Sequence, residues 1–358
     1  MTYTCIDSFS GAGGLSLGLL KAGYHILLSF DNDTKCIQTQ RSNPKYFQHE
    51  AYLANIDSML NGVLLEKVGL RRGDLFILVG GPPCQGFSVQ RIGVDEDIRN
   101  NLVPKFIELV EELLPRYFLM ENVPGIMGKR GKILFKESLD RAVKAGYWLH
   151  QRTLDAQDYG VPQRRKRVFI IGERNDGSFP SFWFPPVTTP VGQRVTVQHI
   201  IGHLPPPPGD GSDHLDILHH RSDKLSEMNK RRLLALQPGQ GRDLLPEELL
   251  ADCHRVSSSR IGHRNVYGRM AWNDVAPTIT AKFDSFTRGQ FGHPEQVRSI
   301  SLREGALLQT FPIDFVFSGN KVDIARQIGN AVPPLLAEVL GKQILICHES
   351  KLKDQQLV

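Results

Sequence analysis

The sequence predicts an α/β protein in which a mainly parallel, Rossmann-like sheet is joined to a smaller, irregular domain. Apolar runs of strand length alternate with runs of helical spacing through residues 1–172. After Gly172 this rhythm fades, and proline-rich stretches such as LPPPPG accompany a group of histidines. Alternating strands and helices are typical of doubly wound parallel sheets, whereas clustered prolines favour irregular structure.

Each element of the predicted sheet follows from a short run of sequence. The strand-like runs are residues 3–9, 25–31, 75–81, 117–122 and 167–172. The helical runs are residues 13–24, 34–40, 101–114, 132–146 and 331–346. We expect the last of these helices to pack back onto the first domain, because its apolar face needs a partner.

Size and composition exclude several classes of protein. The chain has 358 residues, of which 41% are hydrophobic and 23% are charged, so it can bury the cores of two domains and is not a disordered chain. Its apolar runs are strand-sized and too short to cross a membrane. The N-terminal MTYTCIDSF lacks the features of a secretion signal, and we therefore expect a cytoplasmic protein.

Cysteine spacing and net charge add weaker constraints. The 5 cysteines are scattered without CxxC spacing, so we expect a reducing compartment, no structural disulfide and no bound metal. The formal net charge is +5 and the isoelectric point is about 8.9. This excess suits a polyanionic partner, although many enzymes without such a partner reach it.

Polar side chains stand at or just after the ends of four predicted strands. They are Ser10, Asp31, Cys84 and Glu121. In a parallel sheet these ends share one edge, and ligands bind in the crevice beyond it. The convergence of the four residues therefore predicts the place of a functional site.

The first strand ends in a glycine-rich turn, DSFSGAGGLS, at residues 7–16. Gly11, Gly13 and Gly14 permit positive backbone angles and close approach of a ligand. The dinucleotide fingerprint GxGxxG would need a glycine at Ser16, so the turn suits S-adenosylmethionine better than a nicotinamide cofactor. Asp31 is placed to accept hydrogen bonds from ribose hydroxyls. A purely structural turn with a helix-capping acid is the alternative.

A thiol and a carboxylate follow the next two strands. Cys84, in GGPPCQGFS, comes after two prolines that fix the backbone and before the polar segment 85–101, which has the composition of a mobile lid. Glu121, in MENV, is costly to bury without a partner. Together they suit a nucleophile and a proton donor, although a buried cysteine and an ion-paired acid would explain each alone.

The stretch QRRKRVFIIG, residues 163–172, carries four basic residues. Period-two alternation puts Arg165 and Arg167 on one face, where they can meet phosphate or carboxylate groups, and Arg164 and Lys166 on the opposite, solvated face. An ordinary basic edge strand is the alternative.

Taken in order, DSFSGAGG, GGPPCQGFS, MENV, QRRKRV, SLREGALLQTFP and QIGNAVP resemble the motifs of the DNA (cytosine-5) methyltransferases. The resemblance covers nearly all of the first 172 residues and again residues 272–337. It implies an S-adenosylmethionine-dependent enzyme with a Rossmann-like sheet and a target-recognition domain. It further implies that Cys84 attacks carbon 6 of a flipped-out cytosine, that Glu121 protonates ring nitrogen 3, and that Arg165 holds the cytosine carbonyl oxygen.

The resemblance also implies the remaining contacts. Phe9 would stack on the cofactor adenine and Asp31 would bind its ribose. The implied cofactor contacts are Phe9, Ser10, Gly11, Gly13, Gly14, Asp31, Asn32, Asn55, Ile56, Pro83, Leu102, Asn330, Ala331 and Val332. The implied DNA contacts are Ser88, Gln90, Arg167, Arg264, Tyr267, Arg269, Thr278 and Ile279, with Arg260 and His263 as further candidates.

Two positions depart from the family pattern. Asp31 stands where glutamate is usual and is shorter by one methylene group. Asn55 stands at the usual adenine-binding aspartate, and Asp57 competes with it for this role.

The predicted organisation has three parts: a catalytic and cofactor-binding domain at 1–184, a target-recognition domain at 185–300, and a hinge with a C-terminal segment at 301–358. We expect a monomer that acts on double-stranded DNA in the cytoplasm and is associated with the nucleoid. A cognate restriction endonuclease in the same system is the favoured context, and a solitary or phage-borne enzyme is equally compatible with the sequence. A tRNA cytosine-5 methyltransferase, a nicotinamide-dependent oxidoreductase with a redox cysteine, and an inactive DNA-binding protein are the alternatives.

Overall fold

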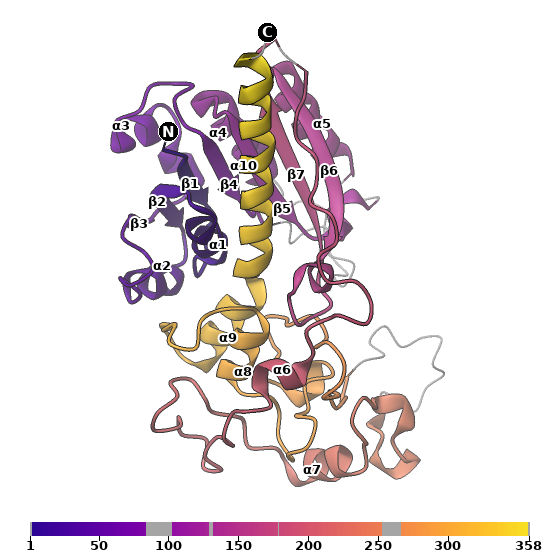
Figure 1. The fold of residues 1–358 in the computed structure, drawn as a ribbon. Helices are drawn as coiled ribbons and strands as arrows, with labels where there is room; N and C mark the ends of the chain where they lie inside the picture. The colour runs from indigo at the N-terminus through magenta and orange to yellow at the C-terminus, as the bar shows by residue number, and fades with distance from the viewer. Residues whose placement is uncertain (1, 84–101, 129–131, 178, 253–265, 357–358) are drawn as a thin grey trace. The chain divides into compact units, whose positions relative to one another are not determined.

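The computed structural model describes residues 2–83, 102–128, 132–177, 179–252 and 266–356. Its centre is a seven-stranded sheet with the order β3-β2-β1-β4-β5-β7-β6. The strands are β1 (Thr4–Ser8), β2 (His25–Asp31), β3 (Glu50–Leu53), β4 (Ile77–Gly80), β5 (Tyr117–Asn122), β6 (Tyr147–Asp155) and β7 (Lys166–Arg174). The predicted α/β class and Rossmann-like sheet are confirmed (Figure 1).

The sheet is parallel except for one strand. β1 pairs in parallel with β2 and β4, and β2–β3 and β4–β5 are also parallel. β7 runs antiparallel to both β5 and β6. The sequence did not predict β3 and β6, the two edge strands. β3 is short, and polar, exposed residues interrupt the apolar pattern of β6 at 151–153.

Helices cover both faces of this sheet (Figure 1). They are α1 (Gly14–Ala22), α2 (Thr34–Arg41), α3 (Val63–Val68), α4 (Leu102–Leu113), α5 (Lys132–Lys144) and α10 (Pro334–Gln356). α4 shows how sequence determines the packing: Phe106, Ile107 and Val110 recur at helical spacing and are fully buried against Leu78 and Phe118.

α10 packs directly against α1, and two glycines make the close contact possible. A side chain at Gly18 would lie 2.3 Å from the carbonyl oxygen of Pro334. A side chain at Gly341 would lie 2.7 Å from Leu19 Cδ2. These distances are shorter than van der Waals contact, so any larger residue would push the two helices apart. Among the helices that the structure describes, none is both long and apolar enough to cross a membrane.

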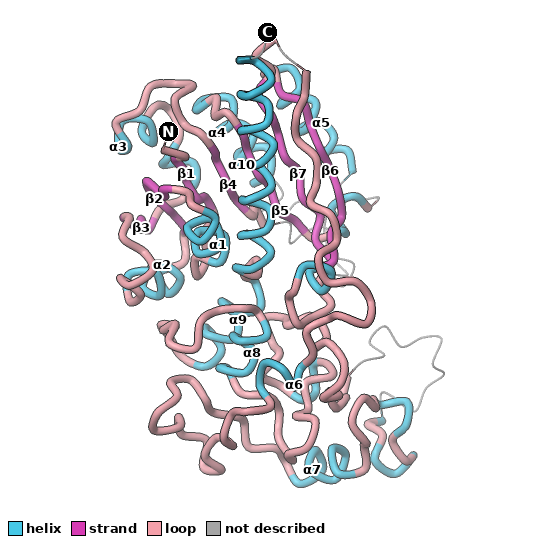
Figure 2. The backbone as a smooth tube through the Cα atoms, in the orientation of Figure 1, coloured by secondary structure: helices cyan, strands magenta, loops and turns pink. Residues whose placement is uncertain are grey.

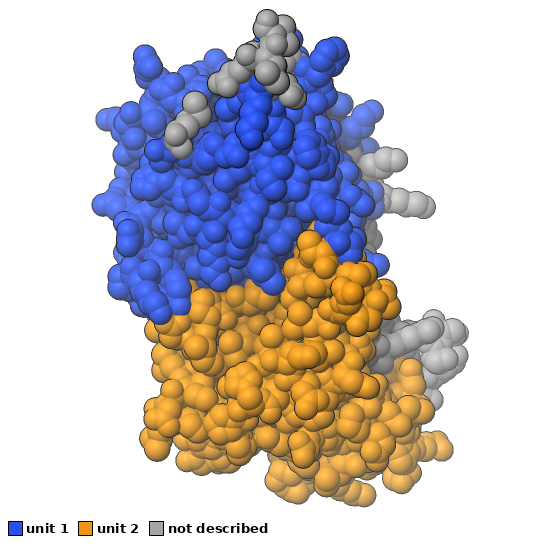
Figure 3. Space-filling view, in the orientation of Figure 1, with its two compact units in different colours: residues 1–155, 166–187, 332–358 blue, residues 156–165, 188–331 orange. Residues whose placement is uncertain are grey.

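The chain divides into two compact units, coloured separately in Figure 3. Unit 1 comprises residues 1–155, 166–187 and 332–358 and contains the whole sheet. Unit 2 comprises residues 156–165 and 188–331. The predicted C-terminal segment, residues 301–358, is divided between the two units. Residues 301–331 belong to unit 2 and residues 332–358 belong to unit 1. The helix α10 accounts for the second assignment, since it packs on α1.

Unit 2 is built mainly from loops around short helices (Figure 2). Its helices are α6 (Val197–Ile201), α7 (Glu227–Leu234), α8 (Leu302–Leu308) and α9 (Lys321–Asn330). Short 3₁₀ turns occur in both units: η1 (Ile56–Met59), η4 (Pro124–Met127), η5 (Ala156–Tyr159), η6 (Arg242–Leu244), η7 (Glu247–Leu249) and η10 (Phe286–Arg288).

Candidate active site

The sheet has a topological switch point between β1 and β4. From β1 the chain moves outward through β2 and β3, then returns to the other side of β1 to form β4 and β5. In open α/β sheets, ligands bind beyond the carboxyl ends of the strands at such a point. Gly80, the last residue of β4, allows the two strands to come together, since a side chain there would lie 2.4 Å from Ser8 Oγ.

The glycine-rich turn after β1 has the backbone geometry that its composition predicts. Gly11 and Gly13 have φ angles of 53° and 85°. Phe9 also adopts a positive φ, 54°, which is uncommon for a bulky residue and typical of strained functional sites. Gly13 faces the protein, because a side chain there would meet Phe47, whereas a side chain at Gly11 would meet none of the described residues within 4 Å. The turn is therefore open at Gly11.

The residue in place of the third glycine has a structural role. Ser16 donates through its hydroxyl (2.6 Å) and its backbone N–H (3.1 Å) to the carboxylate of Asp7, which is fully buried. This pair fixes the first turn of α1 to the end of β1. The sequence reading noted the missing glycine but did not assign a role to Asp7.

Asp7 makes the stability of this turn dependent on pH. Burial raises the pKa of Asp7 from 3.8 to about 7, although the Ser16 hydrogen bonds lower it. Between the pKa of 3.8 and the pKa of about 7, Asp7 keeps its proton in the folded protein but has lost it in the unfolded chain. The contribution of protonated Asp7 to the free energy of unfolding is therefore lost as the pH rises from the lower value to the higher one. Asp7→Asn cannot titrate. Its melting temperature should therefore fall less than that of the wild type between about pH 5 and about pH 8.

Thermal melts at several pH values check this prediction. Asp140→Asn removes an exposed carboxylate on α5 and serves as the matched control. If Asp7→Asn and Asp140→Asn shift the pH profile equally, Asp7 is not the responsible group.

Asp31 links the end of β2 to the glycine turn. Its carboxylate accepts hydrogen bonds from the backbone N–H groups of Gly11 (2.9 Å) and Asp33 (2.8 Å). Burial raises the pKa of Asp31, and these hydrogen bonds oppose that rise. Ser10 is also joined to this strand end, because its N–H and hydroxyl both donate to the carbonyl of Phe30. The predicted cofactor residues Ser10, Gly11 and Asp31 thus form one hydrogen-bonded group.

The end of β3 lies beside the same group. The N–H of Ala54 donates to the carbonyl of Asp31 (3.0 Å), so the exposed Asn55 follows directly after this link. Ile56 is buried in the core beneath it. Asp57, the competing residue, forms an ion pair with Lys105 (3.1 Å). The geometry therefore favours Asn55 over Asp57 for a contact at this edge.

Four residues form what we call the strand-end corner: Gly81, Glu121, Asn122 and Arg167. The side chain of Asn122 donates to the carbonyl of Pro82 (2.8 Å), which ties the end of β5 to the segment just before Cys84. Gly81 lies against Glu121, since a side chain at Gly81 would be 3.2 Å from Glu121 Oε2. Arg167 Nε lies 2.9 Å from Glu121 Oε1, and both side chains are more than four-fifths buried.

Arg167, and not Arg165, is therefore the partner of Glu121. Arg165 belongs to unit 2 and is 1% exposed. Its guanidinium donates to the backbone carbonyls of Ile279, Gly329 and Ala331, each at 2.9 Å. These donors are thus directed at the backbone, and the predicted contact of Arg165 with a cytosine oxygen stays a prediction.

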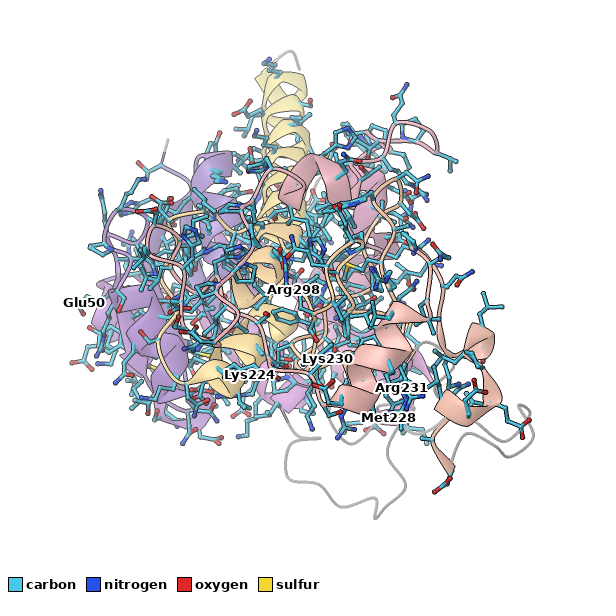
Figure 4. All side chains as sticks on the ribbon, turned by 90° about the horizontal axis from the view of Figure 1, so that it is seen from below. Glu50, Lys224, Met228, Lys230, Arg231 and Arg298 are labelled. Carbon is cyan, nitrogen blue, oxygen red and sulfur yellow. The ribbon has the colours of Figure 1, made fainter. Side chains whose placement is uncertain are left out.

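Several predicted DNA contacts in unit 2 have structural partners. Arg269 is 6% exposed, donates to three backbone carbonyls, and has its pKa lowered by burial. Tyr267 packs edge-on against Phe286 and under the guanidinium of Arg232, which is on α7. Arg269 therefore supports the fold of this unit, and its predicted contact with DNA stays a prediction. α7 also presents the exposed Lys230 and Arg231 (Figure 4).

The other predicted contacts are distributed as follows. Thr278 and Ile279 adjoin the QRR segment, because the Thr278 hydroxyl donates to the carbonyl of Arg164 and the Ile279 N–H to the side chain of Gln163. In unit 1, Gly14 and Leu102 begin α1 and α4, Asn32 is exposed, and Pro83 and Val332 are partly or fully buried. In unit 2, Asn330 ends α9 and Ala331 follows it. Cys84, Ser88, Gln90, Arg260, His263 and Arg264 lie outside the described residues.

Comparison with known proteins gives one consistent result. Residues 3–346 match the model of the C-5 cytosine-specific DNA methylases. The chain is 36% identical over 349 residues to the type II methylase M.HgiDII of Herpetosiphon aurantiacus, covering 96% of this chain and 95% of that protein. It is 34% identical to the type II methyltransferase M1.HphI of Haemophilus parahaemolyticus, covering 96% and 87%.

Solved structures agree at the level of the fold. A proposed DNA modification methyltransferase encoded within an E. coli prophage superposes with a TM-score of 0.74 at 26% identity, covering 97% of this chain and 100% of that one. DNMT2 of Spodoptera frugiperda superposes with a TM-score of 0.66 at 16% identity, covering 96% and 100%, a likeness that extends to the fold alone. These similarities leave no support for the nicotinamide-dependent alternative.

Proposed function

Because the chain belongs to the C-5 cytosine-specific DNA methylase family, we propose that it methylates carbon 5 of one cytosine in a specific duplex DNA sequence. The observation that carries the proposal is the strand-end corner. There a glutamate paired with an arginine lies against the segment that leads into Cys84, at the carboxyl ends of β4 and β5. S-adenosylmethionine is the methyl donor of such enzymes, and when bound it supplies an electrophilic methyl group on a sulfonium centre.

The reaction needs a nucleophile because carbon 5 of cytosine is itself poorly nucleophilic. The Cys84 thiolate adds to carbon 6, a carbon–sulfur bond forms, and electron density moves to carbon 5. Carbon 5 would then take the methyl group as its bond to the sulfonium sulfur breaks, which would leave a neutral thioether as the second product. Loss of the carbon 5 proton to a base re-forms the double bond and expels the Cys84 thiolate. The proton that Glu121 places on ring nitrogen 3 during the addition then returns to Glu121, so that electrons and protons balance. The stacked base is out of reach of these groups, so the cytosine must be flipped out, at a cost of a few kcal/mol.

Glu121 and Arg167 support this addition. As the thiolate adds, negative charge develops on the cytosine ring, and a proton from Glu121 to ring nitrogen 3 relieves it. We assign to Arg167 the role of holding the cytosine carbonyl oxygen, because it lies next to Glu121 and is 14% exposed. A planar guanidinium suits the simultaneous contact with a carboxylate and a carbonyl oxygen.

The glycine turn and the ends of β2 and β3 suit the cofactor. Gly11 is open to a ligand, Asp31 offers carboxylate oxygens to the ribose hydroxyls, and Asn55 offers an amide to the adenine. The strained Phe9 follows directly after β1, where its ring could stack on the adenine. The shorter side chain of Asp31 keeps its carboxylate close enough to bind the turn itself.

Removal of the Asp31 carboxylate should weaken cofactor binding. We expect Asp31→Ala to raise the Kd for S-adenosylmethionine about 10- to 100-fold, since hydrogen bonds to a charged group are lost and the Gly11 N–H loses its partner. Titration calorimetry checks this value. Asp33→Ser is the matched control, because serine retains the N-cap of α2 that Asp33 provides. An unchanged Kd for Asp31→Ala would remove Asp31 from the cofactor site.

Unit 2 would provide target recognition, with Thr278 and Ile279 holding the flipped nucleotide. The type II relatives favour a modification enzyme of a restriction-modification system. We further propose that the protein acts as a monomer in the cytoplasm, bound to nucleoid DNA, and that a cognate restriction endonuclease reads the same sequence without contacting it.

Bisulfite sequencing of methylated DNA tests the proposal directly. Genomic DNA from a methylation-free host that expresses the protein should contain 5-methylcytosine at one position of one recurring short sequence. A parallel assay offers duplex DNA and tRNA with labelled S-adenosylmethionine. Transfer to tRNA alone would establish the RNA alternative, and transfer to neither would refute the proposed activity.

A further inference from the structure

Arg165 joins three segments of unit 2 that lie far apart in the sequence. One guanidinium nitrogen, Nη1, donates to the carbonyl of Ile279. The other, Nη2, donates to the carbonyls of Gly329 and Ala331. A fully buried guanidinium is therefore surrounded by backbone oxygens from the 278–279 loop and from the C-terminal end of α9.

Two buried glutamines close the same network. Gln163 Nε2 donates to Gln309 Oε1 (2.5 Å), and Gln163 Oε1 accepts from the N–H of Ile279 (3.0 Å). Gln309 Nε2 donates to the carbonyls of Ile328 (2.6 Å) and Ala331 (3.2 Å). Both glutamines are fully buried. Ala331 thus accepts from Arg165 and from Gln309 together.

The backbones in this network are packed as closely as a glycine allows. A side chain at Gly329 would lie 2.2 Å from the carbonyl carbon of Thr280 and 2.3 Å from the N–H nitrogen of Ala281. The C-terminal end of α9 is thereby held against the 278–281 segment. The hydroxyl of Thr278 adds a bond to the carbonyl of Arg164.

We propose that Arg165, Gln163 and Gln309 form a positioning hub that holds the nucleotide-binding pair Thr278–Ile279 and the cofactor-binding segment 330–331 in one fixed arrangement. The inference rests on the proposed function of those two segments. It makes Arg165 a residue that affects both ligands without touching either one. None of Gln163, Gln309 and the Arg165 contacts was singled out from the sequence.

The chemistry of the side chains explains why an arginine occupies the centre. Its planar fork offers several donors in fixed directions, which matches carbonyls approaching from different segments. A lysine carries a single ammonium group and cannot hold all three carbonyls in the same geometry. Loss of a donor also leaves buried carbonyls unsatisfied, which costs more than the bond itself contributes.

The hub predicts a kinetic pattern that a catalytic arginine would not give. Arg165→Lys and Gln309→Ala should each weaken binding of S-adenosylmethionine and of duplex DNA about tenfold. The kcat at saturating concentrations of both should stay within about threefold of the wild type, because no group that touches the reacting atoms has changed. The affinities are measured by calorimetry and by DNA titration, below the melting temperature of every variant.

A double-mutant cycle sharpens the test. Arg165 and Gln309 share the carbonyl of Ala331, so the combined variant should lose clearly less affinity than the product of the two single losses. Arg164→Ala is the matched control: Arg164 is the neighbouring arginine, about half exposed, and pairs with Asp274 at the surface. It should bind both ligands as the wild type does.

The possible outcomes separate the hub from its rivals. A fall in kcat with unchanged affinities would make Arg165 a catalytic residue and overturn the proposal. If the variants had lower melting temperatures but unchanged affinities, the network would only stabilise the fold, and the proposal would again be overturned. Wild-type protein is assayed in parallel, so a failure of the proposed function would appear as absent methyl transfer in the wild type itself.

Discussion

Cys84→Ser is expected to abolish methyl transfer, with a loss of at least ~10,000-fold in kcat, because no other group in the proposed mechanism forms the bond to carbon 6. A serine hydroxyl is far less acidic than a thiol and does not supply a comparable anion near neutral pH. Transfer of labelled methyl groups to duplex DNA measures the loss. Binding of S-adenosylmethionine and DNA should be retained.

The same variant gives a second, independent readout. Duplex DNA with 5-fluorocytosine at the target lacks the removable proton at carbon 5, so the wild type should remain covalently attached to it. Cys84→Ser should form no such adduct on a denaturing gel. Cys347→Ala, in a fully buried cysteine of α10, is the matched control and should form the adduct normally. An adduct with Cys84→Ser would refute the covalent mechanism.

Glu121→Gln is expected to lower kcat by ~100- to 10,000-fold, because an amide cannot deliver the proton that relieves charge on the cytosine ring. Glutamine has nearly the same shape, and it retains an oxygen that can accept from Arg167 Nε. The KM for DNA should therefore change much less than kcat. Single-turnover methyl transfer separates these two quantities.

Two further variants complete that experiment. Glu111→Gln alters a surface ion pair with Arg141 and should leave the rate unchanged. Arg167→Ala should reduce kcat in the same direction as Glu121→Gln, since it removes the partner of that carboxylate. If Glu121→Gln changed only the affinity for DNA, Glu121 would be a binding residue and not the proton donor.

The sheet could be predicted from the sequence because its central strands are continuous apolar runs that end in polar residues. Ser10, Asp31 and Glu121 each follow such a run, and parallel topology brings these ends to one edge. The edge strand β6 was missed because three consecutive polar, exposed residues, at 151–153, interrupt its apolar pattern. A strand that is buried on both faces can be recognised in the sequence as a continuous apolar run, whereas an exposed edge strand lacks such a run.

Arg165 and Arg167, two of the three arginines of QRRKR, show where the period-two argument fails. Period-two alternation predicts that Arg165 and Arg167 share one face of a strand. However, β7 begins at Lys166, so Arg165 lies in the loop before the strand and belongs to unit 2. A period-two pattern gives the face of a residue only within a strand. Arg165 contacts the backbone of Ile279 and of residues 329–331, whereas Arg167 contacts Glu121. These partners are distant in the sequence, so the local sequence around the arginines cannot predict them.

Buried polar residues are the other group whose structural role could not be predicted from the sequence. Asp7, Gln163 and Gln309 are fully buried and hydrogen-bonded to specific partners, and Arg269 is 6% exposed and donates to backbone carbonyls. From sequence alone, a charged residue is more often exposed than buried. Such residues can be found only once the fold shows which backbone groups need a donor.

The contact between α1 and α10 has a consequence for how the protein is made. α1 ends at Ala22 and α10 begins at Pro334, so roughly 300 residues must be synthesised before the covering helix exists. At the usual rate of elongation this interval is ~15–60 s, during which the apolar surface of α1 around Gly18 lacks its partner. Unit 1 therefore completes its folding only after unit 2 has left the ribosome. We therefore expect the nascent chain to be most prone to aggregation in that interval, because apolar surface that is later buried is then exposed.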